Sequence, residues 1–176
     1  MSYRHWILQI QPVPKNNWGD NLAHLLPKPV WDKLRREVYD KADHKCEICG
    51  KEDEILHCHE DWTYDDRNHI QSLRGLLSLC KSCHDCIHWF RTERQVIGKK
   101  GKEEGYPIHY LGELKDHFVQ VNKCTYKSFG YYIKQVTYLR DLRLRNNYSL
   151  VYNQWGPKRI VKLYGLTSHT TNKSTR

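Results

Sequence analysis

The chain has 176 residues, with 29 Lys or Arg against 20 Asp or Glu and a formal net charge of +9 when histidine is neutral. This length is typical of one globular domain with an appendage, and it excludes a long multidomain enzyme. Aliphatic runs are only a few residues long, so the sequence predicts neither a membrane-spanning helix nor a secretory signal. We therefore expect a cytoplasmic protein that is basic enough to bind polyanions.

The first part of the chain predicts an irregular segment, a helix and a strand. Residues 1–28 combine a short apolar run with prolines and asparagines, which favours irregular structure with one helical turn near residues 21–26. From Pro29, apolar residues recur at helical spacing and indicate an amphipathic helix that ends before Cys46. Its apolar stripe consists of Trp31, Leu34, Val38 and Ala42. Residues 55–60 then alternate as in a strand, and residues 61–70 are polar and typical of turns.

The rest of the chain predicts mainly helices. Leucines between residues 73 and 79 lead into Cys80, and residues 83–91 lack proline and glycine, as a helix requires. Residues 98–105 predict a flexible charged loop. Apolar stripes over residues 111–121 and 129–139 indicate two further helices, residues 149–165 a hairpin around Gly156-Pro157, and residues 166–176 a disordered tail. We thus expect a core over residues 29–97 and a basic helical extension over residues 106–165.

The positive charge is concentrated in the last third of the chain. Residues 123–176 contain 11 Lys or Arg and a single acid, Asp141, and they hold seven of the 12 tyrosines. Basic residues mixed with aromatic residues are typical of surfaces that bind a phosphate backbone. The alternative for any one of them is a solvated helix face over an aromatic core. The candidate nucleic-acid-binding residues are Lys127, Lys134, Arg140, Arg143, Arg145, Lys158, Arg159 and Lys162.

Four of the seven cysteines have the spacing of a metal site. Cys46 and Cys49 form one C-x-x-C turn, Cys80 and Cys83 form a second, and 30 residues separate the pairs. Zn²⁺ prefers tetrahedral thiolate coordination, in which each C-x-x-C turn supplies two sulfurs. The sequence therefore predicts a structural Zn²⁺ site that joins two remote segments. An iron–sulfur cluster is the alternative, because Cys86 extends the second run to C-x-x-C-x-x-C.

A second group of polar residues lies between and after these turns. His59 and Glu60 end the predicted strand, and His84 and His88 are four residues apart on the predicted helix. Residues at i and i+4 share one helix face, where two neutral imidazoles can hold a divalent cation with open coordination positions. Since the zinc site ties the strand to the helix, we expect His59 or Glu60 to approach the same cation.

Two C-x-x-C turns that enclose a strand ending in histidine, followed by C-x-x-C-H-x-x-x-H on a helix, resemble the HNH endonuclease family over residues 46–88. The wider chain is similar to a bacterial and phage branch of that family. The resemblance implies an α+β fold with a ββα-metal core, stapled by the four-cysteine zinc site and flanked by helices. It also implies hydrolysis of DNA phosphodiester bonds, with one catalytic divalent cation, Mg²⁺ or another, and with a strand residue as general base.

The match to the family leaves two registers open at the strand end. In the first, His59 is the base and Cys58 takes the position next to the metal, as a soft ligand poorly matched to Mg²⁺. In the second, His59 is the metal ligand and Glu60 is the base. The asparagine of the family also has no counterpart, because Gly75 stands near its position; Asp61, Asp65 and Asp66 are the candidate substitutes. We expect His57 and His69 to be surface residues.

The leading interpretation is a metal-dependent endonuclease that nicks or cuts DNA, which we expect to be double-stranded, with the basic C-terminal region on the backbone. A zinc-stabilised nucleic-acid-binding module without catalysis is the alternative, and a nuclease directed at RNA is a third. The sequence leaves the oligomeric state open.

Overall fold

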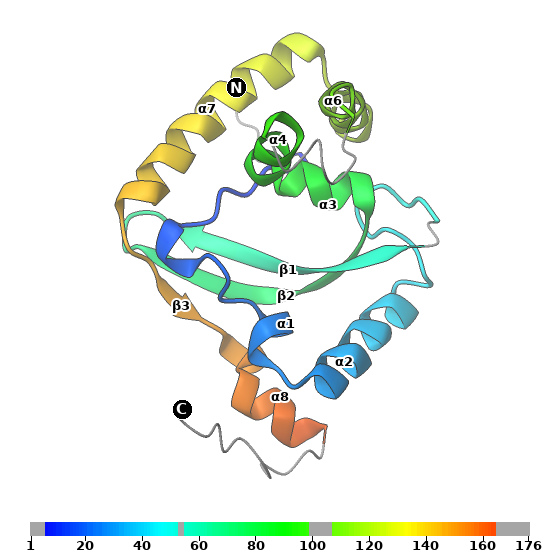
Figure 1. Cartoon of the computed structure of the whole chain (residues 1–176), viewed down its shortest axis with the longest axis vertical. Helices are drawn as coiled ribbons and strands as arrows, with labels where there is room; N and C mark the ends of the chain where they lie inside the picture. Colours follow the sequence, from blue (N-terminus) through cyan, green and yellow to red (C-terminus); the bar gives the residue numbers. More distant parts are fainter. Residues whose placement is uncertain (1–5, 53–54, 99–106, 165–176) are drawn as a thin grey trace.

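A mixed three-stranded sheet lies at the centre of the molecule (Figure 1), with the strand order β1-β2-β3. The computed structural model describes residues 6–52, 55–98 and 107–164. β1 (Leu56–Asp65) and β2 (Ile70–Cys80) form an antiparallel hairpin, and the short β3 (Ser149–Val151) pairs with β2 in parallel. Because β3 occupies the far side of β2, β1 is an edge strand of the sheet.

Both strands of the hairpin are longer than the sequence predicts. β1 continues through residues 61–65, which were expected to form a turn, because Trp62 and Tyr64 prolong the strand beyond Glu60. The register shifts between Asp61 and Trp62, and the hairpin turn falls at residues 66–69. Asp65 stabilises that turn by accepting hydrogen bonds from the backbone N–H groups of Arg67 and Asn68.

Helices cover both faces of the hairpin (Figure 1). On one side lie α1 (Leu22–Leu25) and α2 (Lys28–Lys41), preceded by the short 3₁₀ turn η2 (Lys15–Asn17). The opposite side carries α3 (Lys81–Ile87), α4 (Trp89–Ile97), α6 (Tyr110–Val121) and the long α7 (Tyr126–Arg145). These positions confirm the helices expected after Pro29, after Cys80 and over residues 111–121 and 129–139.

The C-terminal hairpin expected over residues 149–165 is wrong. Only Ser149–Val151 is extended, and it joins β2 instead of a strand of its own. The 3₁₀ turn η3 (Asn153–Trp155) and the helix α8 (Pro157–Leu163) follow. Pro157 stands in the first helical turn, where its fixed φ and missing N–H are compatible with a helix start, so the Gly-Pro pair begins a helix here.

Two apolar cores hold the layers together. The first lies between the sheet and α3, α4, α6 and α7, and it is centred on Phe118, with Trp6, Phe129 and Tyr132 in edge or stacked contact around it. The second lies on the other face of the sheet, where Leu22 and Leu73 are fully buried and contact α2 and α8. Burying residues of this size contributes about 1.5–3 kcal/mol each.

The N-terminal segment is held by specific hydrogen bonds, although the sequence predicts it to be irregular. The backbone N–H of Ile10 donates to the phenolic oxygen of Tyr132 on α7, at 2.9 Å, and the N–H of Gln11 donates to the carbonyl of Ile87. This segment therefore closes one side of the core between α3 and α7. No helix in the described ranges is long and apolar enough to cross a bilayer. Of the loop expected over residues 98–105, Gly98 ends α4 and residues 99–105 lie outside the described residues, as does the tail over residues 166–176.

Candidate metal centres and cleft

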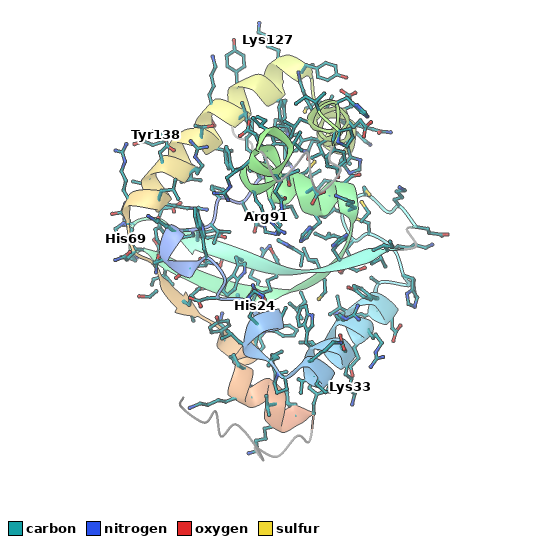
Figure 2. All side chains as sticks on the ribbon, viewed as in Figure 1. His24, Lys33, His69, Arg91, Lys127 and Tyr138 are labelled. Atoms are coloured by element: carbon teal, nitrogen blue, oxygen red, sulfur yellow. The ribbon has the colours of Figure 1, made fainter. Side chains whose placement is uncertain are left out.

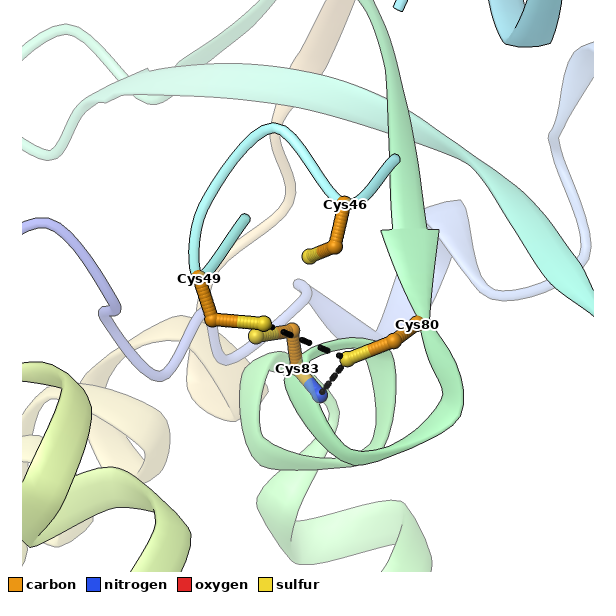
Figure 3. A group of neighbouring side chains, drawn as sticks. All are labelled: Cys46, Cys49, Cys80 and Cys83. Carbon is orange, nitrogen blue, oxygen red and sulfur yellow. Dashed lines mark hydrogen bonds between the residues drawn. The ribbon is translucent and has the colours of Figure 1, made fainter. Parts of the chain in front are cut away.

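Four cysteine sulfurs converge where the turn after α2 meets the end of β2 and the start of α3 (Figure 3). The ligand atoms of Cys46, Cys49, Cys80 and Cys83 all lie within 4.8 Å of one another, and the sulfurs of Cys49 and Cys80 are 3.7 Å apart. Cys80 also accepts a hydrogen bond from the backbone N–H of Cys83, at 3.5 Å, and so caps α3. A four-cysteine set in this arrangement is consistent with a structural Zn²⁺.

Backbone contacts hold the first cysteine turn in place against β2. The N–H of Glu47 donates to the carbonyl of Ser78 at 2.9 Å, and the N–H of Ser78 donates to the Glu47 carboxylate at 2.7 Å. Gly50 closes the turn with φ +74°, a conformation that disfavours residues with a Cβ. These contacts join the turn after α2 to the end of β2, two segments far apart in the sequence, at the four-cysteine cluster.

The sulfurs are close enough to shift one another's pKa values, downward at Cys46 and upward at the two cysteines of the second turn. Hydrogen bonding to Cys46, together with burial, raises the pKa of the Cys80 thiol to about 12, and neighbouring thiols also raise the pKa of Cys83. A bound metal ion would lower these thiol pKa values, because it binds the thiolate form directly. His117 on α6 places Nε2 at 3.1 Å from the sulfur of Cys83. Cys86 donates its S–H to the carbonyl of Leu114 and belongs to no metal-type group among the described residues.

A second group brings together three histidines from β1 and α3. The ligand atoms of His59, His84 and His88 lie within 4.8 Å of one another, and the ring centroids of His59 and His88 are 4.9 Å apart. His88 both ends α3 and precedes α4, so it lies one turn after His84 on the same helix face. Within the described part of the chain, the buried His59 Nε2 has no hydrogen-bond partner, and His84 Nδ1 lies 3.6 Å from a carboxylate oxygen of Asp85.

Burial keeps two of these imidazoles neutral. Desolvation lowers the pKa of His59 well below its usual value, with His88 and His84 as further causes. Desolvation and the nearby His84 lower the pKa of His88 to about 3. A neutral imidazole has a free lone pair for a metal, and imidazole suits Zn²⁺, Cu²⁺ or Ni²⁺, whereas Mg²⁺ prefers oxygen ligands. The donor set therefore fits a transition metal better than Mg²⁺.

A fourth histidine lies beside this group. The ring of His57 stacks on the ring of His84, with centroids 4.8 Å apart and planes at 15°. The prediction that His57 is a surface residue is thus incomplete, since its ring is half-buried. The alternation of His57 and His59 along one strand was a signal for a shared face.

Glu60 faces away from the three histidines. Its carboxylate accepts hydrogen bonds from the backbone N–H of Leu22 and from the indole N–H of Trp62, the latter at 3.1 Å. Burial raises the pKa of Glu60 to about 7. Cys58 lies on the same face as Glu60 and is absent from the metal-type groups among the described residues. His59 thus lies with His84 and His88, as the second register requires of a metal ligand, whereas Glu60 lies on the opposite face of β1.

Both faces of β1 open onto one cleft, because β1 is the edge strand. The cleft has a volume of about 1140 Å³ and is bordered by His59, His84 and His88 on one face and by Glu60 on the other. Its outer walls are formed by the segment around Trp18 and by α4.

The candidate replacements for the family asparagine are all engaged elsewhere. Asp61 pairs with Arg74 at 2.6 Å, Asp65 stabilises the hairpin turn, and Asp66 accepts hydrogen bonds from Arg143. Gly75 lies opposite Asp61 in the β1–β2 ladder. In the described ranges, none of these carboxylates belongs to the histidine group.

The basic residues of the C-terminal region divide into two sets. Arg143 is only 5% exposed and donates to both carboxylate oxygens of Asp66 and to the carbonyl of Pro12, so its expected role in phosphate binding does not fit its position. Arg140 is half-buried, pairs with Asp141 and lies over the ring of Phe90. The other candidates have exposed side chains: Lys127, Lys134, Arg145, Lys158, Arg159 and Lys162.

Comparisons with known proteins give a distant relationship. No family model matches the chain, and no solved structure matches it. "MOG interacting and ectopic P-granules protein 1" of Caenorhabditis elegans is 26% identical to the chain over 125 residues. This alignment covers 63% of the chain, and the chain spans 14% of the length of that protein. The class that fold and site define is a ββα arrangement with a four-cysteine cluster and a histidine triad.

Proposed function

We propose that the chain is a divalent-metal-dependent endonuclease that hydrolyses phosphodiester bonds of DNA. One observation carries the proposal: His59, His84 and His88 converge at a cleft, and the buried Nε2 of His59 has no hydrogen-bond partner in the described part of the chain. Three protein ligands leave coordination positions open. A cation bound there would stabilise the negative charge that develops on a phosphoryl oxygen.

In this proposal His59 is a metal ligand and Glu60 is the general base. Glu60 borders the same cleft, and its carboxylate is held by the donors of Leu22 and Trp62. A carboxylate fixed in this way can take a proton from a water molecule that attacks the phosphate. His59 and Glu60 both line the cleft, from which a water molecule would reach them.

Relaxation of supercoiled plasmid tests the proposal. The protein should nick or linearise the plasmid with Ni²⁺, Zn²⁺ or Mn²⁺, less with Mg²⁺, and not after the added metal is chelated. His84→Ala should abolish cleavage, and Glu60→Gln should slow it by about 10²–10⁴-fold, the usual contribution of a general base. His69→Asn is the matched control, because His69 lies at the far hairpin turn with φ +52°, which asparagine tolerates. Undiminished cleavage by both site variants would refute the assignment.

A nucleic-acid-binding module without catalysis is the second candidate function. Gly75 in place of the family asparagine and the engagement of Asp61, Asp65 and Asp66 favour it. Plasmid that stays intact with every metal, together with a gel shift of the same plasmid, would support this module. Faster cleavage of RNA than of DNA would instead support the third interpretation.

A further inference from the structure

The cleft beside the histidine group has an aromatic wall and a basic wall, and neither contains a residue discussed so far as functional. Trp18 lines one side and is 50% exposed. Arg91 and Arg94 of α4 line the other side, and both are exposed. Figure 2 shows Arg91 below α4, on the side of that helix that faces β1. Of these two guanidinium groups, that of Arg94 lies over the indole ring of Trp18. An exposed indole beside guanidinium groups is a combination typical of sites for single nucleic-acid strands.

The aromatic wall is rigid. The indole N–H of Trp18 donates to the carbonyl of Val13 at 3.0 Å, and the guanidinium of Arg94 lies 5.4 Å from the centre of the indole ring. Just before Trp18, the buried side chain of Asn17 donates to Gln71 of β2 at 3.0 Å. Just after it, Gly19 turns the chain with φ +90°. These contacts hold the indole in place before any ligand binds, which lowers the entropy cost of stacking.

The basic wall is positioned by the packing of α4. Trp89, Thr92 and Val96 are buried, and Thr92 also donates its hydroxyl to the carbonyl of Asp85 at 3.2 Å. The opposite face of this helix carries Arg91 and Arg94, three residues apart, toward the cleft. Arg91 follows His88 by three residues and acts on the histidine group as a nearby positive charge. Its guanidinium is thus near the position proposed for the scissile phosphate.

The volume of the cleft favours a single nucleic-acid strand over a duplex. A volume of about 1140 Å³ is only slightly above the range of about 300–1000 Å³ for pockets that enclose small organic ligands. Such a space accommodates a short stretch of one strand, whereas a duplex keeps its bases paired and unable to reach a wall inside the cleft. Stacking on Trp18 requires an unpaired base.

We propose that this cleft binds an unpaired DNA strand, with one base stacked on Trp18 and a backbone phosphate beside Arg91. The proposal rests on the proposed nuclease function for the identity of the substrate, and it replaces duplex DNA by single-stranded or locally opened DNA. Any base can stack on Trp18, because every base has a π-face, so we expect binding without sequence preference. Arg91 supplies the charge that attracts the backbone.

Fluorescence anisotropy with a labelled dT strand of about 12 nucleotides, alone or annealed to its complement, tests the proposal. The intact protein should bind the single strand more tightly than the duplex. Trp18→Ala should weaken binding of the single strand by about 5- to 150-fold, and Trp18→Phe, which keeps a stacking face, should restore most of it. Arg91→Ala should flatten the logarithmic salt dependence by about 0.7. His69→Asn is the matched control, because His69 lies outside the cleft at the far hairpin turn (Figure 2), with a φ of +52° that asparagine tolerates.

Equal or tighter binding of the duplex would overturn the proposal, as would unchanged binding by Trp18→Ala in protein whose circular dichroism is native. An equal loss in His69→Asn would also overturn it, since the effect would then not belong to the cleft. These outcomes are separate from those of the nuclease assay, because binding is measured whether or not the strand is cut. If the protein cleaves DNA but does not prefer single strands, the nuclease proposal holds and the single-strand proposal is wrong.

Discussion

One step along β1 turns a side chain to the opposite face of the strand, and this step separates His59 from Glu60. His57 and His59 face α3, where their rings contact His84, while Glu60 accepts hydrogen bonds from Leu22 and Trp62 on the other face. The two residues are adjacent in the chain but see different neighbours. Their roles in the proposed reaction differ for the same reason.

At the same scale, the four cysteines should carry the stability of the fold through one metal ion. Cys49→Ser should remove one equivalent of zinc, measured by elemental mass spectrometry, and should lower the melting temperature or unfold the protein. A structural zinc site contributes about 10–16 kcal/mol in small metal-binding peptides, which is as large as the stability of a typical domain. Cys124→Ser is the matched control, because Cys124 lies outside the cluster. Full zinc content in Cys49→Ser would contradict the assignment of this ligand.

Among the elements, α7 and the hairpin are joined by a partly buried ion pair. Arg143 donates to both oxygens of Asp66, and Tyr148 donates its hydroxyl to Asp66 at 2.7 Å. The guanidinium also lies over the ring of Tyr64, 3.8 Å from its centre. This cluster fixes the C-terminal end of α7 against the sheet, and with it the start of β3.

Breaking this pair should destabilise the fold. Arg143→Gln should lower the free energy of unfolding by about 3 kcal/mol, because it leaves a partly buried carboxylate without its partner. Arg145→Gln, two residues further along α7 and exposed, should change it by less than about 0.5 kcal/mol. Urea denaturation followed by circular dichroism measures both values. Equal effects of the two variants would show that the ion pair contributes nothing.

The same pair predicts how stability depends on pH. Burial raises the pKa of Asp66, but hydrogen bonds from Arg143 and Tyr148 lower it more, so the net shift is downward. A carboxyl group whose pKa is lower in the folded state stabilises the protein above its ordinary pKa and loses this contribution as the pH falls through the folded value. Asp66→Asn should therefore be less stable than the parent protein at neutral pH, and the difference should shrink at acidic pH. A difference that is constant with pH would contradict this account.

The sequence predicts some of these helices and strands correctly and others incompletely. Helices with clear apolar stripes, such as α2 and α6, follow from local spacing alone. The extension of β1 to Asp65 does not, because its polar residues are stabilised by pairing with β2. The parallel contact of β3 with β2 depends on where α7 ends, which is a tertiary property.

Parts of the candidate site also follow from the sequence, and other parts do not. The C-x-x-C spacing predicts the four-cysteine cluster, because two turns of fixed geometry need only be brought together. The i, i+4 spacing likewise predicts that His84 and His88 share a helix face. The walls of the cleft could not be predicted, because Trp18 and Arg91 meet the histidines only through the packing of the N-terminal segment and α4.

For the whole molecule, the exposed face of α7 lies opposite its packed face. Lys127, Tyr131, Lys134, Tyr138 and Arg145 are exposed, whereas Phe129, Tyr132 and Val136 are buried. Lys127 and Tyr138 project outward in Figure 2. This face is therefore a second basic surface, distinct from the residues of the cleft, and the proposed function predicts that a longer nucleic acid contacts it.

The second surface should show in the salt dependence of binding. Replacing Lys127, Lys134 and Arg145 by alanine should reduce the slope of log affinity against log salt for a long duplex by up to about 3, since each phosphate contact contributes about 0.9. Binding of a short single strand, which fills the cleft, should change much less. An unchanged slope for the long duplex would assign these residues to solubility alone.

The number of metal ions held by the chain tests the central claim most directly. After incubation with excess Zn²⁺ and gel filtration, the intact protein should retain two equivalents, one at the cysteines and one at His59, His84 and His88. His59→Ala should retain one, and His69→Asn should retain two. A single equivalent in the intact protein, or two in His59→Ala, would contradict the existence of the histidine centre.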